Sequence, residues 1–435
     1  MKEPIAPNTP AMRPTRPLPF EISQVVRRIG SASYYFVRFS FSDLRGSPQQ
    51  LELPRSKARE FRAVAKRLLD QGIPTGDALL LAELIREEIE RTEQEPPAEL
   101  VDRTGWHDKS FVFPGLDLGA AAGRILFEGA PAHPYSIDIG SPEEWKNCLG
   151  KTFNPSLPHV FAMAAALAAP LLRFSGLPGD VAFLFTHEGQ ANVSTVMQAA
   201  ASVCTGEPSV LELQAGEPKH SSSSMRHQFA DLPRLVPCGS GSVDLLEDML
   251  GQRLGISRQG HDAGNASSSS TEVPPRSIIL AAVDVRVDRR ALLGNRPDHS
   301  DTLVIAVPGH PPMAEAMARQ SFDWTAAKVA NVCGRHAGHA LPAFVGATVR
   351  HLDKLPQMVE DKIESFLATV KREAPLSVSE EKVLNAFALV CAAGTLAAEW
   401  EISPWSKERC VEACRHMALG HFELIAEADA DPFLT

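Results

Sequence analysis

Hydrophobic and polar positions near the amino end alternate with period two before changing to helical spacing. Residues 33–43 (SYYFVRFSFSD) alternate and are rich in aromatic residues, which predicts a strand, and QQLELP at 49–54 predicts its hairpin partner. Residues 56–72 have the spacing of an amphipathic helix, with a serine to open it and a glycine to close it, and residues 76–92 predict a second helix. Together these elements predict a small mixed α/β module over residues 18–92.

The next part of the chain mixes short strands with helices. Residues 103–115 and 123–130 predict strands separated by turns, and Ser141 is placed to cap a helix. An Ala-rich apolar helix is predicted over residues 158–173. Its longest apolar stretch is about half the length that a membrane span needs, so we expect a buried helix and no membrane partner.

Repeated short apolar runs then predict a layered α/β core. The apolar run 181–185 leads into a polar turn, and a helix is predicted over about 193–205. Four further runs bounded by turn residues suit buried strands of a mostly parallel sheet: 208–214, 233–239, 276–287 and 301–309. Towards the carboxyl end the pattern becomes helical, over residues 357–372, 378–400 and 405–427.

These patterns divide the chain into segments. We expect a disordered tail over 1–17, the amino-terminal α/β module over 18–92, a β-rich connecting segment over 93–150, an α/β core over 151–350 and a helical region over 351–435.

Charge separates the amino-terminal module from the rest. The 435-residue chain has a net charge of -10, yet residues 1–67 hold 13 Lys and Arg against 5 Asp and Glu, which leaves -18 on the remainder. Such a module could bind a phosphate backbone, the acidic body of the same chain or a neighbouring subunit. Because no aromatic residues are interleaved with the basic ones along the sequence, we expect this basic module to bind a protein surface, either of the same chain or of a neighbouring subunit, rather than DNA. The seven cysteines are odd in number and scattered, and no signal peptide is visible, which indicates the cytoplasm.

The turn after residues 181–185 has the outline of a phosphate-binding loop. A P-loop at this point would read Gly, four residues, Gly, Lys and then Ser or Thr. The sequence instead reads HEGQANVS over residues 187–194, where only the final serine fits. The turn is therefore either a degenerate nucleotide loop or an unrelated strand–helix turn.

Six stretches in a fixed order resemble the domain-of-unknown-function 927 family: TGWHDKSFVFPG, GSPEEWKNCLG, FAMAAALAAPLLRFSGLPG, AAASV, HAGHALPAFV and FALVCAAGTLAAEWEISPW. The resemblance covers nearly the whole chain from about Phe20. It implies a RecA/superfamily-3-type P-loop ATPase with a RecA/AAA-like core, as found in phage, plasmid and integrative-element proteins and often beside primases. It also implies assembly as a ring.

When the loop is aligned with the phosphate loop of the family, it lacks the glycines and the lysine that bind triphosphate. The family's Gly-x-Ser-Ser-x-Gly-Lys-Thr-Thr falls on His187, Glu188, Gly189, Gln190, Ala191, Asn192, Val193, Ser194 and Thr195. The two glycines become His187 and Asn192, and the lysine becomes Val193, which offers no positive charge to the β- and γ-phosphates. Glu188 adds a negative charge, and a lone Ser194 hydroxyl is a weak Mg²⁺ site.

Two more elements of the implied ATPase are altered. The acidic pair that would orient Mg²⁺ and water falls on Pro237 and Cys238. In the third element the acid survives as Asp284, while the hydroxyl residues become Ala281 and Ala282. Three elements altered together predict a fold retained without ATP hydrolysis, and therefore no bound cofactor.

Other groups of polar residues carry weaker signals. Arg286, Arg289 and Arg290 follow the third core strand and could line a nucleic-acid channel, act as a trans-acting finger or form a solvated face. Cys333, His336 and His339 have a spacing that zinc accepts, but no convincing fourth ligand follows, so we predict no metal site.

The sequence thus predicts a catalytically degenerate, helicase-like subunit of a mobile-element nucleic-acid complex. We expect it to be a homo- or hetero-oligomer with DNA or other mobile-element proteins as partners. One alternative is an active ATPase or DNA helicase with a nonstandard loop, using ATP and Mg²⁺ and perhaps a cation from a neighbouring subunit. A second is a protein-interaction module of an anti-phage or anti-restriction system.

Overall fold

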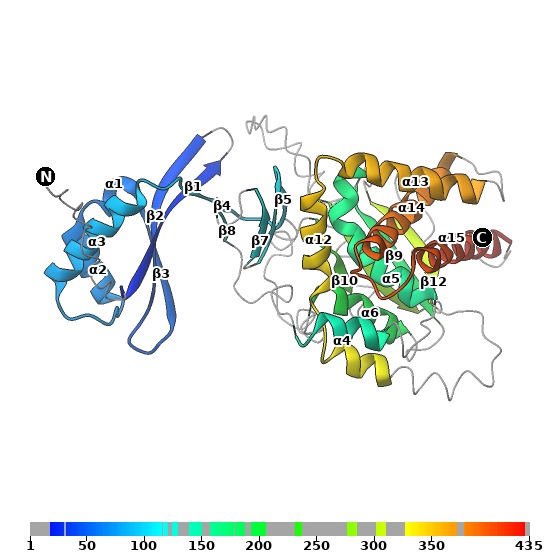
Figure 1. Ribbon diagram of the computed structural model, residues 1–435, viewed down its shortest axis with the longest axis horizontal. Helices are drawn as coiled ribbons and strands as arrows, with labels where there is room; N and C mark the ends of the chain where they lie inside the picture. The colour runs from blue at the N-terminus through cyan, green and yellow to red at the C-terminus, as the bar shows by residue number, and fades with distance from the viewer. Residues whose placement is uncertain are drawn as a thin grey trace, which may run out of the picture. The chain divides into compact units, whose positions relative to one another are not determined.

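The computed structural model separates into two compact units, residues 1–100 and 101–435, and each is described by itself (Figure 1). The structure describes residues 18–29, 32–114, 116–120, 124–128, 139–149, 157–177, 179–187, 193–205, 231–236, 276–284, 302–309, 327–371 and 378–430. The predicted tail over 1–17 and the predicted strand over 208–214 lie outside these residues.

The first unit contains the strands β1 (Phe20–Ile29), β2 (Ala32–Ser42), β3 (Pro48–Pro54) and β4 (Ala98–Val101), in the order β3-β2-β1-β4. β2 pairs antiparallel with β1 and β3, and β4 runs parallel to β1. The predicted hairpin of residues 33–43 and 49–54 is confirmed. The sequence pattern missed β1 because Gln24 interrupts its alternation: Gln24 lies on the helix-bearing face and donates to Thr92 Oγ1 at 3.2 Å.

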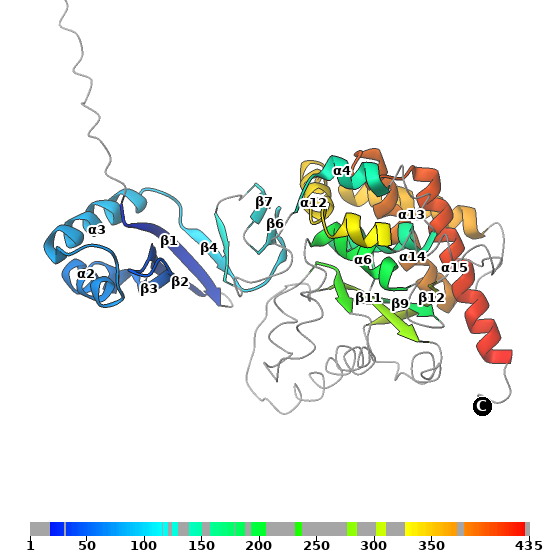
Figure 2. The same cartoon turned by 90° about the horizontal axis from the view of Figure 1, so that it is seen from below.

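Three helices, α1 (Arg55–Ala58), α2 (Phe61–Asp70) and α3 (Ala78–Thr92), complete this unit, and α2 and α3 lie against one face of the strands (Figure 2). The single helix predicted over 56–72 is wrong, since the chain breaks at Arg59 and Glu60. At the break Arg59 forms an ion pair of 2.9 Å with Glu93. The apolar spacing runs on across residues 58–68, so the pattern gave no sign of the interruption.

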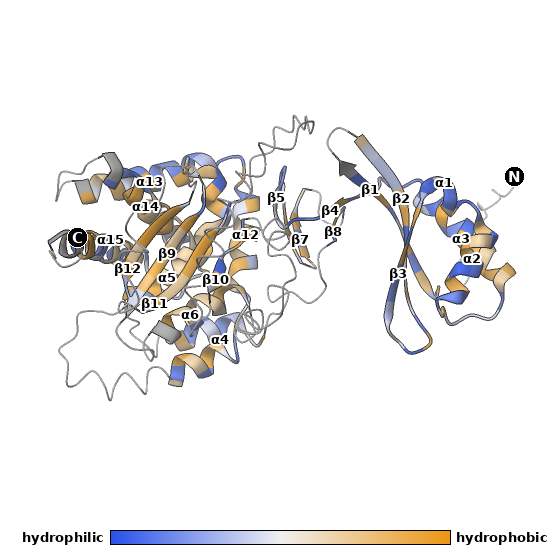
Figure 3. Cartoon of the chain, turned by 180° about the vertical axis from the view of Figure 1, so that it is seen from behind, coloured by the Kyte–Doolittle hydropathy of each residue, from blue (hydrophilic) through white to orange (hydrophobic). Residues whose placement is uncertain are grey.

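The second unit is built on a four-stranded sheet of β9 (Val181–His187), β10 (Arg234–Val236), β11 (Ile278–Asp284) and β12 (Leu303–Pro308). The order is β10-β11-β9-β12 and every pairing is parallel. This confirms a parallel α/β core. Both faces of β9 and β11 are apolar and buried, as expected for central parallel strands, and Figure 3 shows both strands hydrophobic along their length.

Short strands also occur near the start of this unit: β5 (Gly105–His107), β6 (Ser110–Phe113), β7 (Leu116–Gly119) and β8 (Ile125–Phe127). β5, β6 and β7 form an antiparallel sheet, while Glu128 N, just after β8, donates to Val101 O at 2.8 Å. Strands were predicted over 103–115 and 123–130, whereas β7 was missed.

The second unit also contains the helices α4 (Pro142–Asn147), α5 (Leu157–Ala168), α6 (Val193–Cys204), α12 (Ala340–Arg350), α13 (Leu355–Lys371), α14 (Val378–Glu399) and α15 (Lys407–Ala430). Figure 2 shows α6, α13, α14 and α15 on the same side of β9, β11 and β12. Ser141 caps α4 as predicted, because its Oγ accepts from Glu144 N at 3.4 Å. The helix predicted over 158–173 ends early and continues as a 3-10 helix, Ala169–Phe174, where Pro170 lacks the N–H that an α-helix needs.

Aromatic rings join the sheet to its helices. Phe161 of α5 lies 5.1 Å from Phe183 of β9, and Phe387 of α14 lies 5.6 Å from each of them, between ring centroids. α15 contacts β12 through His421, whose buried ring donates from Nδ1 to Ala306 O at 2.8 Å. Beside it, Gly420 lies so close to β12 that a Cβ atom there would come within 2.7 Å of Pro308 Cγ.

Two helical stretches, Leu157–Phe174 and Glu380–Glu399, are long and apolar enough by composition to cross a membrane. They are 83% and 72% buried inside the second unit. Such burial is typical of core helices, so their apolar character is accounted for by the packing of the protein itself.

Candidate functional site

The carboxyl edge of the parallel sheet is where the topology places a binding crevice. The chain runs from β9 past β11 to β10, returns to β11, and then crosses to β12 on the other side of β9. In open parallel sheets, ligands bind outside the carboxyl ends of strands at such a reversal of strand order. The segment that leaves β9 at this edge is the loop singled out from the sequence.

The structure brings two of the predicted site residues together. His187 ends β9 and Asp284 ends β11, and the two are partners in the parallel register. The acid predicted for the third element, Asp284, therefore lies beside the first position of the predicted loop. Ala281 and Ala282 are buried within β11, at 1% and 2% exposure, where hydroxyl groups were expected in the family.

The loop itself enters a helix at once. α6 begins at Val193, so the residue in the lysine position occupies the first helical turn together with Ser194. Glu188, Gly189, Gln190, Ala191 and Asn192 lie outside the described residues, as do Pro237 and Cys238 after β10, and Arg286, Arg289 and Arg290 after β11.

Thr195 is the one loop hydroxyl whose surroundings are described. Its side chain is 3% exposed, and Oγ1 lies 3.0 Å from Nε2 of His159 on α5. His159 is 7% exposed, and burial lowers its pKa to about 4, so the ring is neutral at physiological pH. A neutral imidazole offers no positive charge, and the hydrogen bond joins the first turn of α6 to α5. Thr195 is therefore part of the helix packing.

The sequence analysis did not single out His159. Within the segment PSLPHVFAMAAALAAP it is the one ionisable side chain, placed early in a helix that is otherwise buried and apolar. Because a buried polar group needs a hydrogen-bond partner, a lone histidine in an apolar helix could have indicated a buried partner such as Thr195.

A second group of polar residues was also missed, at the amino edge of the same strands. Asp180, before β9, accepts from Ser277 N at 2.8 Å, and Asp231, before β10, accepts from Trp106 N at 3.0 Å. Burial raises the pKa of Asp231 to about 6, against the opposing influence of Arg103, Arg173 and Arg276. These acids satisfy backbone N–H groups where strands begin, on the edge opposite the loop.

The Cys333, His336 and His339 group is engaged in structural contacts. His336 Nδ1 accepts from Ser141 N at 3.0 Å, and His339 Nε2 lies 3.1 Å from Ile139 O. Burial raises the pKa of the Cys333 thiol to about 12, which disfavours the thiolate that zinc requires. The two histidines thus fix the segment before α4 to the segment before α12.

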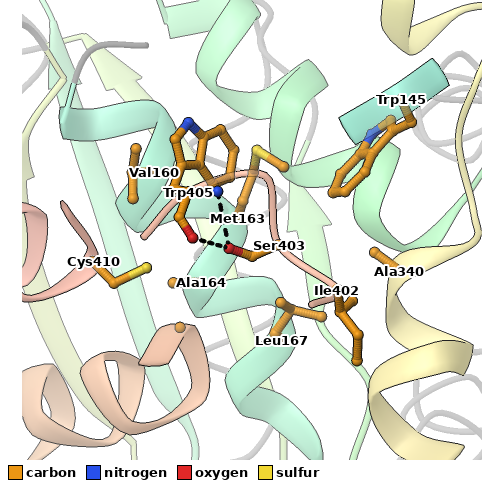
Figure 4. Close-up of a pocket in the computed structure, with 11 residues that line it drawn as sticks. Trp145, Val160, Met163, Ala164, Leu167, Ala340, Ile402, Ser403, Trp405 and Cys410 are labelled. Atoms are coloured by element: carbon orange, nitrogen blue, oxygen red, sulfur yellow. Dashed lines mark hydrogen bonds between the residues drawn. The ribbon is translucent and has the colours of Figure 1, made fainter. Parts of the chain in front are cut away.

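A small hollow lies apart from the strand edge, between α5 and the segment after α14 (Figure 4). Met163 and Leu167 of α5, Trp145 of α4 and Ile402 line it, and Ser403 Oγ donates to Trp405 O at 3.0 Å. The hollow is apolar and has room for about one water-sized sphere. It is therefore a packing defect rather than a site for a nucleotide.

Comparison with known proteins finds a solved structure with a similar fold and a matching family model. A solved structure described as "SCCmec type IV Cch - active helicase" resembles the chain with a TM-score of 0.52 and 13% sequence identity, over 94% of this chain and 75% of that one. At this identity the likeness shows the fold. Residues 7–216 match the model of the family described as domain of unknown function (DUF927). No curated protein matches the sequence.

Proposed function

We propose that this protein is a helicase-like subunit that does not hydrolyse ATP and acts as a structural or regulatory component of a mobile-element nucleic-acid complex. The single observation behind the proposal is Val193. It stands at the first turn of α6, directly after the loop that leaves the central strand, where a lysine would meet the β- and γ-phosphates.

The residues around this position do not fit Mg²⁺ and triphosphate. Losing the charge-assisted hydrogen bonds of the lysine removes about 1.5–3 kcal/mol each. Glu188 adds a like charge to a polyanion, and the Thr195 hydroxyl is held by His159 inside the helix packing. No step of nucleotide chemistry is therefore assigned to this chain.

The other two altered elements support the same proposal. Pro237 and Cys238 stand where an acidic pair would orient the attacking water, and Ala281 and Ala282 lie buried in β11. Asp284 keeps its place at the end of β11 beside His187. One acid beside a loop without its lysine and glycines cannot by itself position both a metal ion and a water.

A phosphate-release assay on the pure protein tests the proposal directly. We expect no release above background with Mg²⁺ and ATP, with or without single-stranded DNA, and no change in Ser194→Ala. Thermal unfolding gives an independent readout, since a ligand at 100 times its Kd would add about 2.7 kcal/mol of stability, enough to shift Tm by several degrees. Turnover that Ser194→Ala abolishes would contradict the proposal.

A second candidate follows from the words "active helicase" in the description of the similar structure. In this case a neighbouring subunit would donate the missing cation to a nonstandard loop. It predicts a Tm increase with MgATP and a specific activity that rises with protein concentration, because the site would be complete only in the oligomer. The first proposal predicts neither result.

We further propose that the protein works in the cytoplasm as a homo- or hetero-oligomer, with DNA or other mobile-element proteins as partners. The alternative of a stand-alone interaction module in an anti-phage or anti-restriction system predicts no retention of DNA at ~100 mM salt. Binding through phosphates would be present at low salt and fall steeply as salt rises.

A further inference from the structure

The solvent-exposed side of α2 is basic. It carries three exposed cations, Arg62, Lys66 and Arg67, and one exposed acid, Asp70. Among the residues that the structure describes, none of these three cations forms an ion pair. Arg62 and Lys66 are four residues apart, so their like charges repel each other on one side of the helix. Three cations against Asp70 leave this side of α2 with a net charge of +2.

The solvent-exposed side of α3 has the opposite sign. Three of its exposed acids form no ion pair with any described residue: Glu83, Glu87 and Glu90. Arg86 is exposed among them, while Arg91 is engaged by Glu88 and Glu95. Three acids against Arg86 leave this side of α3 with a net charge of -2, which equals the charge on α2 in magnitude. Two neighbouring helices therefore carry uncompensated charges of opposite sign.

Two leucines in the first turn of α3 add apolar surface beside these charges. Leu79 is 64% exposed and Leu80 is 45% exposed, whereas Leu81 in the same turn is fully buried in the core of the unit. The core is therefore closed without the first two side chains. Adjacent exposed leucines with charged residues around them are typical of a surface that another protein covers.

The arrangement of a basic helix beside an acidic one decides the class of partner. α2 and α3 pack against the same face of the strands, so their exposed sides form one surface (Figure 2). A nucleic acid or an acidic peptide attracted to α2 would be repelled by α3. The partner must therefore carry both signs side by side. A second copy of this surface carries them in the reversed order when the two copies face each other.

We infer that α2 and α3 form a two-fold contact between copies of this chain, in which α2 of each copy lies on α3 of the other. The turn that joins the helices is short, so they run antiparallel, and a two-fold axis parallel to them produces this pairing. Arg62 and Lys66 are about 6 Å apart along their helix, as are Glu83 and Glu87 along theirs, so both pairs match. A self-complementary contact closes at a dimer. The inference rests on the oligomer of the proposed function and deepens it by naming the contact surface.

Charge reversal in the full chain, followed by sedimentation velocity over a range of protein concentrations, tests the contact. The wild type should dimerise with an affinity that falls as NaCl rises, because salt screens surface charges. Arg62→Glu with Lys66→Glu, or Glu83→Lys with Glu87→Lys, should each weaken dimerisation by at least about 10-fold, since symmetry places every altered residue in the contact twice. An equimolar mixture of the two variants should recover the dimer, because each supplies the charge that the other lacks.

Two control variants change the net charge equally at other exposed positions. Glu360 and Glu364 are exposed and four residues apart on α13, so Glu360→Lys with Glu364→Lys matches the reversal on α3. Lys354→Glu with Lys382→Glu matches the reversal on α2, since both lysines are exposed on the second unit. Both controls should dimerise as the wild type does. Circular dichroism and Tm would confirm that each variant is folded.

The outcomes separate this inference from the proposed function. Reversal variants that dimerise like the wild type, or a mixture of them that stays monomeric, would overturn the contact and leave the absence of ATP hydrolysis untouched. If the wild type is monomeric at every concentration and the reversal on α2 lowers its Tm, α2 contacts its own chain and the inference is wrong. Phosphate release by a protein whose mixed variants recover the dimer would instead contradict the proposed function and support the contact.

Discussion

The buried pair of His159 and Thr195 makes a prediction about stability in acid. Burial lowers the pKa of His159 to about 4, whereas an unfolded histidine titrates near 6.5. Between these values the unfolded chain binds more protons, so stability falls as pH falls through this window. Linkage over the two pKa values gives a loss of about 2 kcal/mol between about pH 8 and about pH 5 from this one side chain.

Urea unfolding of the wild type and His159→Gln over this pH range measures the effect. Glutamine keeps a hydrogen-bonding nitrogen for the Thr195 hydroxyl and removes the titration. Other groups titrate in both proteins, so the quantity of interest is the difference between the two unfolding free energies at each pH. We expect it to shift in favour of the variant by about 2 kcal/mol towards pH 5. If the unfolding free energies of the wild type and His159→Gln changed with pH in parallel, the reasoning would be refuted, because His159 would then be solvated or already charged in the folded protein.

Three further predictions concern packing and buried groups. Gly420→Ala should destabilise the protein by about 1–3 kcal/mol through overpacking against β12. Gly346→Ala should stabilise α12 by about 0.5–1 kcal/mol, because the nearest atom to an added Cβ there is 3.8 Å away. Urea unfolding of both variants would show a lower unfolding free energy for the first and a higher one for the second. Because the pKa of Asp231 is raised to about 6, its contribution to stability should fall as pH rises from about 4 to about 6, and Asp231→Asn should flatten that part of the profile. Burial raises the thiol pKa values of Cys204 and Cys333 to about 12. Both thiols should therefore resist alkylation in the native protein and react in urea, which mass spectrometry would follow. Rapid labelling of the native protein would contradict their burial.

The parallel core was predictable because its signals are local. Strands such as 278–284 are continuous apolar runs bounded by turn residues, and buried parallel strands require that composition. The last three helices, α13, α14 and α15, were equally visible from their spacing, whereas α12 was not predicted. By contrast, Arg59 at the break between α1 and α2 pairs with Glu93, a residue 34 positions further along the chain, and periodicity carries no information about such a partner.

The same distinction applies to the candidate sites. The sequence alone shows that Val193 stands where a P-loop would have its lysine, because phosphate binding by a P-loop requires a fixed order of residues. The pairing of His159 with Thr195 depends on helix packing, which brings together residues 36 positions apart.

The close fit of α15 to β12 has a mechanical consequence. Gly420 has no side chain between α15 and β12, and His421 hydrogen-bonds to the backbone of β12 at Ala306 O. A movement of β12 should therefore move α15 with it. β12 adjoins β9, and the candidate loop follows the end of β9 in the sequence. A spectroscopic probe at the exposed Leu419 would therefore report any ligand or partner that shifts the sheet, without a label anywhere near the binding event.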